Sequence, residues 1–191
     1  SENAPQLLSP GVDLGAGAAQ PAWLQQPGEH LPTWLEALPE LSMEAAEQLR
    51  LRQGFPAVPS ELNDSTNPFE LGLAPWVSLN KGCYVGQETL AKLATYDGVK
   101  QQLRHWRGGA AGSCTAGTTL FTAAGERAGV ITSALAGADG LEGLALVRRS
   151  ALDAEELFAA GADGAASADM ALQISMPAGF VAPPVGAGGL S

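Results

Sequence analysis

The feature that most restricts the fold is a change of pattern near residue 99. From there to residue 176 the chain consists of short β-like runs joined by glycine-bearing turns, with the sequences VKQQLRHW, TTLFTAAGERAGVITSAL, LEGLALVRR and ALQISM. The segment FTAAGERAGV predicts a hairpin, with Gly125 able to take a positive φ angle. Several short strands in succession favour a small antiparallel barrel or sandwich. We assign this domain to residues 109–176, after a boundary near Gly108–Gly112.

The preceding part of the chain mixes helices with proline-rich turns. The segment TWLEALPELSMEAAEQLRLRQG predicts a helix interrupted at Pro39, with Ser42 as N-cap and Gly54 just after its end. Prolines at positions 56, 59, 68 and 75 exclude a helix from the next segment, because the residue before a proline is pushed out of the helical region. WVSLN then predicts a short strand, and GQETLAKLATY a second helix.

Both ends of the chain lack a periodic pattern. Residues 1–32 are rich in Pro, Gly, Ala and Gln and predict an irregular linker, and residues 177–191 predict a flexible tail. The segment AAGADGAASAD predicts a loop between strands. Because the chain begins with Ser1 rather than Met, we expect either a processed start or the C-terminal part of a longer protein. Residues 33–108 form the remaining expected domain.

Composition and charge narrow the class of function. Hydrophobic residues make up 46% of the 191 positions and aromatic residues only 6%, so the core must be built mainly from Ala, Leu and Val. The net charge of −10 argues against a general nucleic-acid or membrane-surface binder. No apolar run approaches the roughly 20 residues that span a bilayer, and no signal peptide is visible. We therefore expect a cytoplasmic protein.

Cysteine and histidine are too few for a disulfide framework or a zinc site. Cys83 and Cys114 are the two cysteines, and His30 and His105 the two histidines. Cys114 lies in GGAAGSCTAG and is interpreted as incidental, while His105 alternates along a predicted strand as a surface or packing residue. We expect no metal site formed by this chain alone.

Cys83 lies in the most distinctive stretch, NKGCYVGQETLAK. Lys81 and the N-terminus of the helix that begins near Gly86 would both favour the thiolate, the reactive form of cysteine. The alternative is a buried structural cysteine beside a helix start. No His–Asp pair is near in sequence, which disfavours a Cys-His hydrolase.

Basic residues are concentrated around this stretch. Residues 81–107 hold five basic and two acidic residues, a net +3 within a chain of −10. One interpretation is a solvated strand face, and the other is a local site for a small anionic ligand. The basic residues are Lys81, Lys92, Lys100, Arg104 and Arg107.

The stretch NKGCYVGQETLAKL resembles the Lys-Gly-Cys-Tyr-x-Gly-Gln-Glu signature of the YgfZ-type folate-binding proteins. These are relatives of the glycine-cleavage T-protein, an aminomethyltransferase, and act in iron–sulfur cluster assembly and repair. The segments LRLRQGFPAVPSEL, TNPFELGL and AGERAGVITSALAGADGLEGLALVRR are also similar to the family, so the resemblance covers about Leu41 to Ile174.

The resemblance implies an α+β fold. The C-terminal part of the aminomethyltransferase (T-protein) folate-binding fold would be followed by a small antiparallel β-barrel. The early lobes of that fold have no counterpart here, so the N-terminal portion of the same protein is an expected partner.

The resemblance also implies site residues. Cys83 would be the catalytic residue, and Glu70 and Arg50 would bind tetrahydrofolate or a derivative. From the basic cluster between Lys81 and Arg107 we also expect Lys92, together with Arg104, to draw in the glutamate tail of the folate. Arg52 departs from the T-protein, which has an acid there that contacts the pterin; a guanidinium does not suit the N–H donors of that ring. The other motif residues are Lys81, Gly82, Tyr84, Gly86, Gln87 and Glu88.

The expected function is that of a folate-binding accessory factor in iron–sulfur cluster assembly or repair, serving enzymes such as those of tRNA modification. One cysteine cannot hold a cluster alone, because such clusters take about four thiolates, so iron–sulfur assembly or client proteins are expected partners. Two alternatives stay open: a tetrahydrofolate-dependent aminomethyl- or methyltransferase, and a non-catalytic interaction module.

Overall fold

The computed structural model describes residues 6–13, 19–24, 30, 32–108, 114–137, 140–162 and 164–186. It divides into two compact units, Ser1–Leu49 and Arg50–Ser191, which are described separately. In its described part, no helix is both long enough and apolar enough to cross a membrane.

The first unit contains secondary structure where the sequence predicts an irregular linker. Strands β1 (Gln6–Asp13) and β2 (Ala19–Leu24) pair antiparallel within the predicted linker. The short helix α1 (Thr33–Glu36) follows, where the sequence predicts the part of a helix that precedes Pro39. The register shifts between Leu8 and Val12, on either side of Pro10, which has no N–H to donate to a ladder. This interruption breaks the alternation that would have revealed the strand.

Helix α2 (Met43–Gln53) confirms the helix predicted after Pro39. The hydroxyl of Ser42 accepts a hydrogen bond from the backbone N–H of Ala45 at 3.1 Å, as an N-cap does. The helix stops before Gly54, whose φ is +72°. Its last residues belong to the second unit, where Leu51 is fully buried.

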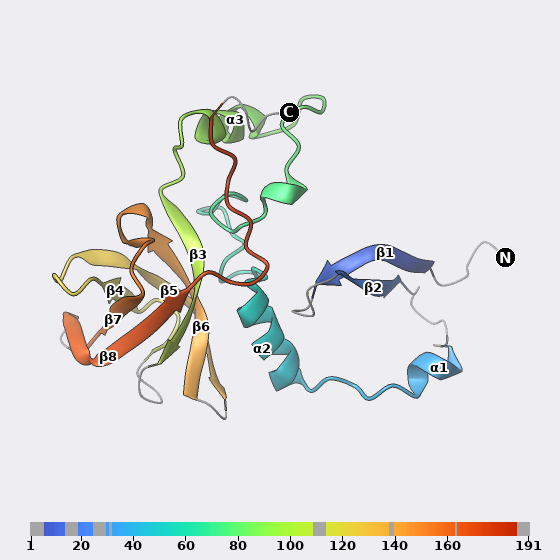
Figure 1. Ribbon diagram of the computed structural model, residues 1–191, viewed down its shortest axis with the longest axis horizontal. Helices are drawn as coiled ribbons and strands as arrows, with labels where there is room; N and C mark the ends of the chain where they lie inside the picture. Colours follow the sequence, from blue (N-terminus) through green and yellow to red (C-terminus); the bar gives the residue numbers. More distant parts are fainter. Residues whose placement is uncertain are drawn as a thin grey trace. The chain divides into compact units, whose positions relative to one another are not determined.

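The second unit is built on a closed six-stranded antiparallel barrel, which confirms the expected fold class (Figure 1). The strand order is β3-β6-β5-β4-β7-β8, with β8 closing on β3. The barrel begins one strand earlier than the boundary near Gly108–Gly112 implies, because β3 precedes it. The strands are β3 (Gln101–Gly108), β4 (Thr119–Phe121), β5 (Arg127–Gly137), β6 (Gly140–Arg148), β7 (Glu156–Ala160) and β8 (Ala166–Ser175).

Three hydrophobic clusters hold this unit together. The barrel interior is centred on Trp106, which is fully buried and donates its indole N–H to the Leu144 carbonyl at 3.1 Å. A second cluster joins Leu51 of α2 to the barrel wall at Leu103. A third packs helix α3 (Gln87–Thr95), which confirms the second predicted helix, against Phe69.

The prediction of a strand at WVSLN, residues 76–80, is wrong. Residues 74–76 form a 3₁₀ turn (Ala74–Trp76), and residues 77–80 join no strand. Val77 and Leu79 pack on the Phe69 cluster while their neighbours Ser78 and Asn80 are exposed. Alternate burial against a cluster thus imitates the period-two pattern of a strand.

Two further differences from the sequence-based expectations concern β7, which the sequence does not predict, and β8, which begins inside the low-complexity segment. A second short 3₁₀ turn (Arg149–Ala151) follows β6.

The described part of the predicted flexible tail, residues 177–186, is packed in place, and we call it the C-terminal strap. Its backbone N–H groups donate to the carbonyls of Arg52, Gln53, Gly72 and Ala94, at 3.0 to 3.2 Å. Figure 1 shows the strap in dark red, running from β8 past the end of α2 toward α3. Residues 187–191 lie outside the described residues.

Phe180 is the anchor of the strap. It is 8% exposed and packs with Leu71 and Leu103. Gly72 lies beneath it with φ +76°, and a Cβ there would stand 2.4 Å from the Phe180 ring, so only glycine allows this approach. Arg104 lies 5.2 Å from the ring centroid of Phe180 as a cation–π partner.

Replacing Phe180 by Ala should lower the free energy of unfolding by about 3 kcal/mol, the usual cost of emptying a buried Phe site. Denaturant unfolding would measure it. Val185→Ala, in the same strap but 59% exposed, is the matched control and should cost less than about 0.5 kcal/mol. Equal effects of the two changes would show that the strap is not packed in solution.

Candidate functional site

The Cys83 motif forms a turn-rich loop that leads into α3. Cys83 itself is exposed, which contradicts the alternative of a buried structural cysteine. Gly86 stands at the N-cap position of α3 with φ 88°, in the left-handed region that favours glycine. The loop can therefore turn sharply into the helix while its cysteine stays accessible.

Gln87 holds the loop in shape. Its side-chain amide donates hydrogen bonds to the carbonyls of Leu79 at 2.9 Å and Lys81 at 3.1 Å. The ammonium of Lys81 lies 5.2 Å from the ring centroid of Tyr84, within cation–π range. The spacing of the motif thus has a local explanation, because its residues support one another around Cys83.

A cavity of about 500 Å³ adjoins this loop, and we call it the motif cavity. It is lined on one side by Lys81, Tyr84 and Gly86, and on the other by segments 66–68 and 76–78. The hydroxyl of Tyr84 is buried and has no hydrogen-bond partner within the described residues. Such an orphaned donor is uncommon in folded proteins and needs an explanation.

The three residues expected to bind folate lie in different surroundings. Lys92 is exposed and pairs with Glu88 one helical turn away at 2.8 Å. Arg50 donates to the buried Glu61 carboxylate at 3.3 Å, to the Phe55 carbonyl and to the Ser133 hydroxyl. Glu70 is 7% exposed and faces a second cavity. Their assignment to folate stays a prediction, since the structure does not bring them together.

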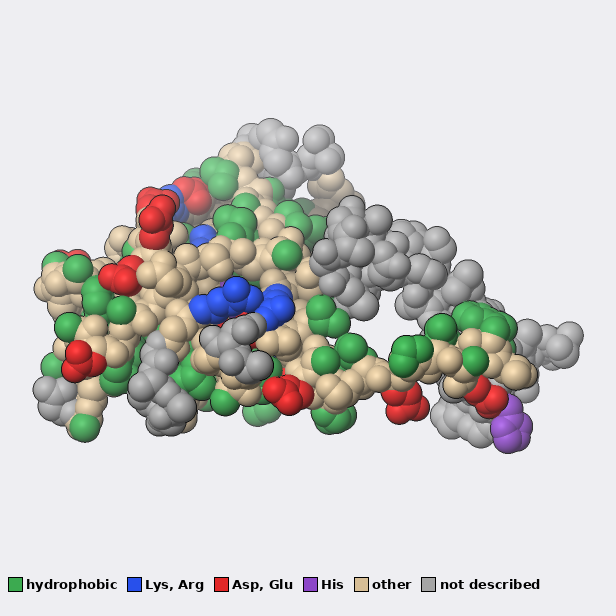
Figure 2. Space-filling view, turned by 60° about the horizontal axis from the view of Figure 1, so that its bottom comes forward, with side chains coloured by type: hydrophobic (Ala, Val, Ile, Leu, Met, Phe, Trp, Pro, Cys, Tyr) green, Lys and Arg blue, Asp and Glu red, His purple; other side chains and the backbone are tan. Residues whose placement is uncertain are grey.

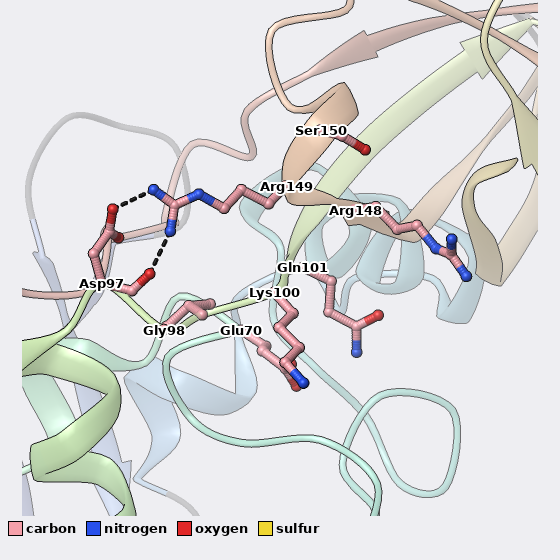
Figure 3. Close-up of a pocket in the computed structure, with 9 residues that line it drawn as sticks. Glu70, Asp97, Gly98, Lys100, Gln101, Arg148, Arg149 and Ser150 are labelled. Atoms are coloured by element: carbon pink, nitrogen blue, oxygen red, sulfur yellow. Dashed lines mark hydrogen bonds and ion pairs between the residues drawn. The ribbon is translucent and has the colours of Figure 1, made fainter. Parts of the chain in front are cut away.

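The second cavity, of about 640 Å³, lies where β3 begins and β6 ends, and we call it the β3–β6 cavity (Figure 3). Besides Glu70 it is lined by Asp97, Lys100, Arg148 and Arg149. The guanidinium of Arg149 donates hydrogen bonds to both the backbone carbonyl and the carboxylate of Asp97. Glu70 accepts the backbone N–H of Asn67 at 3.1 Å.

The basic residues from Lys81 to Arg107 do not form one cluster. Lys92 projects from α3 beside Glu88, and Lys100 lines the β3–β6 cavity. Arg104 is buried beneath Phe180, where desolvation lowers its pKa and nearby Asp153 opposes the change. These residues are close in sequence but do not gather in space, in part because successive residues of a strand face opposite sides. Figure 2 shows one gathering of basic side chains on the face in view, with acidic side chains scattered around it.

Sequence reasoning missed a charged cluster centred on Glu142. Glu142 is 4% exposed, and its carboxylate accepts two hydrogen bonds from Arg52, at 3.0 and 3.1 Å. His105 contacts it at 3.1 Å, and Arg107 at 3.4 Å from the opposite position of β3. Arg52, where the T-protein has an acid, is therefore occupied with a protein carboxylate. Only the pairing of β3 with β6 brings these residues together, and the sequence does not show that pairing.

His105 is buried rather than a surface residue, at 6% exposure. Burial lowers its pKa, while the hydrogen bond and charge of Glu142 partly oppose this change. The folded chain therefore binds the His105 proton less tightly than the unfolded chain. The stability that follows from neutral His105 is present above the unfolded value of 6.5 and is lost as the pH falls through the folded pKa.

We expect the free energy of unfolding to decrease on acidification below about pH 6.5, and His105→Gln to flatten the dependence in that range. Urea titrations at a series of pH values would measure both slopes. The exposed His30, replaced in the same way, should leave the wild-type slope unchanged. A slope that persists in His105→Gln would assign the effect to other groups.

Gln87→Ala should destabilise the motif loop, because it leaves two carbonyls without their donor. We expect a loss of about 1–2 kcal/mol and faster amide hydrogen exchange in residues 80–86. The control is Glu88→Ala, which removes only an exposed ion pair with Lys92 and should cost less than about 0.5 kcal/mol. If both variants exchange alike, Gln87 does not hold the loop.

Parts of this chain are similar to known proteins. No profile of a known protein family matches the chain. It is 38% identical over 146 residues to a chloroplastic putative transferase of Arabidopsis thaliana, which is 73% of this chain and 33% of that protein. It is also 38% identical over 69 residues to the mitochondrial dimethylglycine dehydrogenase of Mus musculus, 36% of this chain and 8% of that protein. The chain spans a third or less of the length of these curated relatives.

Among solved structures, the glycine cleavage system aminomethyltransferase T from Bartonella henselae matches with a TM-score of 0.57 at 23% identity. The match covers 74% of this chain and 39% of that one. At this identity the likeness concerns the fold, and the closer resemblance to YgfZ-type proteins stays a prediction. The chain has part of the aminomethyltransferase T fold, including a closed six-stranded antiparallel barrel.

Proposed function

We propose that this chain is part of a folate-binding accessory protein in iron–sulfur cluster assembly or repair, in which Cys83 works beside a reduced folate. One observation carries the proposal. An exposed thiol stands in a loop whose other motif residues build the loop and line the motif cavity. The likeness to aminomethyltransferase T supports it at the level of the fold.

The residues of the motif cavity suit a reduced folate. A pterin is a flat ring system that carries hydrogen-bond donors and acceptors, and the unpartnered Tyr84 hydroxyl could serve either role. Trp76, at 77% exposed, offers an aromatic face at the same cavity. Lys81 and Asn67 add polar groups. These four residues would hold the ring, and the bound folate would supply one-carbon or reducing chemistry.

Cys83 would act together with groups of another protein. A cluster takes about four thiolates, whereas the other cysteine, Cys114, is buried in the barrel interior. The exposure of Cys83 leaves its thiol open to an iron–sulfur assembly or client protein.

The surroundings of the loop also suit a further protein segment. Val85 is fully exposed and Trp76 largely so, and both border the motif cavity. We propose that the N-terminal portion of the same fold covers this surface, as the small share of each relative that the chain spans suggests. A cytoplasmic location stays a prediction, and the Arabidopsis relative is named as chloroplastic.

The second candidate is a tetrahydrofolate-dependent aminomethyl- or methyltransferase, favoured by the names of the Arabidopsis and Bartonella proteins. The surroundings of Arg52 weigh against it. That side chain is held by two hydrogen bonds to Glu142, so the position supplies no free carboxylate for a pterin.

The test is complementation of cells that lack their own protein of this kind. This protein should restore the activity of an iron–sulfur enzyme such as a tRNA methylthiotransferase, and its Cys83→Ser variant should not. Cys114→Ser is the matched control, because it removes the other thiol, and it should still restore activity. Full rescue by Cys83→Ser, with equal protein levels, would overturn the role of the thiol.

A further inference from the structure

The β3–β6 cavity has an excess of positive charge that plays no part in the proposed function of the Cys83 loop. Three basic residues line it, Lys100, Arg148 and Arg149, against two acidic ones, Asp97 and Glu70. The whole chain carries −10, so a concave site with this balance runs against the average charge of the molecule. The excess of one basic over acidic residues in the lining favours an anionic ligand over a cationic one.

The framework of the cavity is fixed by the barrel. Gln101 of β3 lies opposite Arg148 of β6 in the strand register. The backbone N–H of Arg149 donates to the Lys100 carbonyl at 2.8 Å, just beyond the ladder. Two distant parts of the sequence therefore contribute basic side chains to one cavity. In Figure 3 Arg149 points toward Asp97, while Lys100 and Arg148 point in other directions.

Asp97 fixes the third basic residue. It follows α3 with φ 50°, a left-handed conformation that Asp tolerates better than most residues. There its carbonyl and carboxylate both bind the Arg149 guanidinium. Asp97 thereby neutralises Arg149 and orients it, so neither group supplies the excess charge.

The remaining groups leave two cations available. Lys100 and Arg148 are exposed, and neither has an ion-pair partner in the part of the chain that the structure describes. Glu70 is only 7% exposed, and one of its carboxylate oxygens accepts a hydrogen bond from the backbone N–H of Asn67. In Figure 3 Gln101 lies between Lys100 and Arg148 and adds an amide donor.

We propose that the β3–β6 cavity binds a small molecule with two or more anionic groups, either carboxylates or phosphates. Lys100 and Arg148 would contact separate anionic groups, with Gln101 between them, and the Asp97–Arg149 pair would shape the adjoining wall. The site is distinct from the motif cavity, with which it shares no lining residue. Its occupation does not require Cys83.

The test is titration of the chain with two probes, triglutamate for carboxylates and inorganic pyrophosphate for phosphates. Nuclear magnetic resonance would follow the backbone amides of Lys100, Gln101 and Ser150, and calorimetry would give the affinity. Lys100→Gln and Arg148→Gln should each weaken binding about fivefold, the effect of removing one partly exposed charge contact. Arg127→Gln, an exposed arginine outside the cavity, is the charge-matched control and should change affinity less than about twofold.

The outcomes separate the sources of the ligand. Binding of triglutamate alone identifies a carboxylate site, binding of pyrophosphate alone a phosphate site, and binding of both a general oxyanion site; each supports the proposal. Affinity should also fall as salt is raised from about 0.05 M to about 0.5 M. The proposal is overturned if neither probe moves these amides at millimolar concentration, or if Arg127→Gln weakens binding as much as the cavity variants. Binding that persists in Cys83→Ser would keep this site apart from the proposed function.

Discussion

The buried carboxylate of Glu61 is the interaction on which the second unit depends. It has no exposed surface and accepts hydrogen bonds from the Ser133 hydroxyl at 2.6 Å, the Ala57 N–H at 2.9 Å and the Arg50 guanidinium at 3.3 Å. A buried charge is tolerated only with such partners. Because they come from β5, from the turn after α2 and from α2 itself, one group fixes three segments. Arg50 thus helps to hold these segments together, and its assignment to folate stays a prediction.

From this point the chain is held on its way to the cysteine loop. The Thr66 hydroxyl donates to the Glu61 carbonyl at 2.7 Å, and the Glu70 carbonyl accepts the N–H of Leu103 on β3 at 2.8 Å. Phe69 then packs under α3, and Gln87 closes the loop from the other side. The thiol of Cys83 is therefore presented by a supported loop, which suits a reactive group better than a freely moving one.

The sequence predicts the local features of this protein better than its long-range ones. Ser42, Gly54 and the glycine turns predict helix ends and hairpins correctly, because capping and turn chemistry act over a few residues. The Glu142 cluster and the β3–β6 cavity depend on which strands pair, and no local pattern reports that. The sequence predicts a flexible tail where the strap lies, because the packing of the strap relies on Phe180 above Gly72, which no local pattern reports. Similarly, the sequence leaves open whether Cys83 is exposed or buried, because the fold of the loop, and not its residue types, decides that exposure.

The most direct test of the account is the rate at which Cys83 is alkylated with and without tetrahydrofolate, followed by mass spectrometry of the intact chain. We predict that Cys83 reacts quickly in the free protein, that saturating folate slows the reaction several-fold, and that the buried Cys114 stays unmodified in both cases. A rate that is the same at all folate concentrations would contradict the central claim, since it would separate the exposed thiol from any folate site.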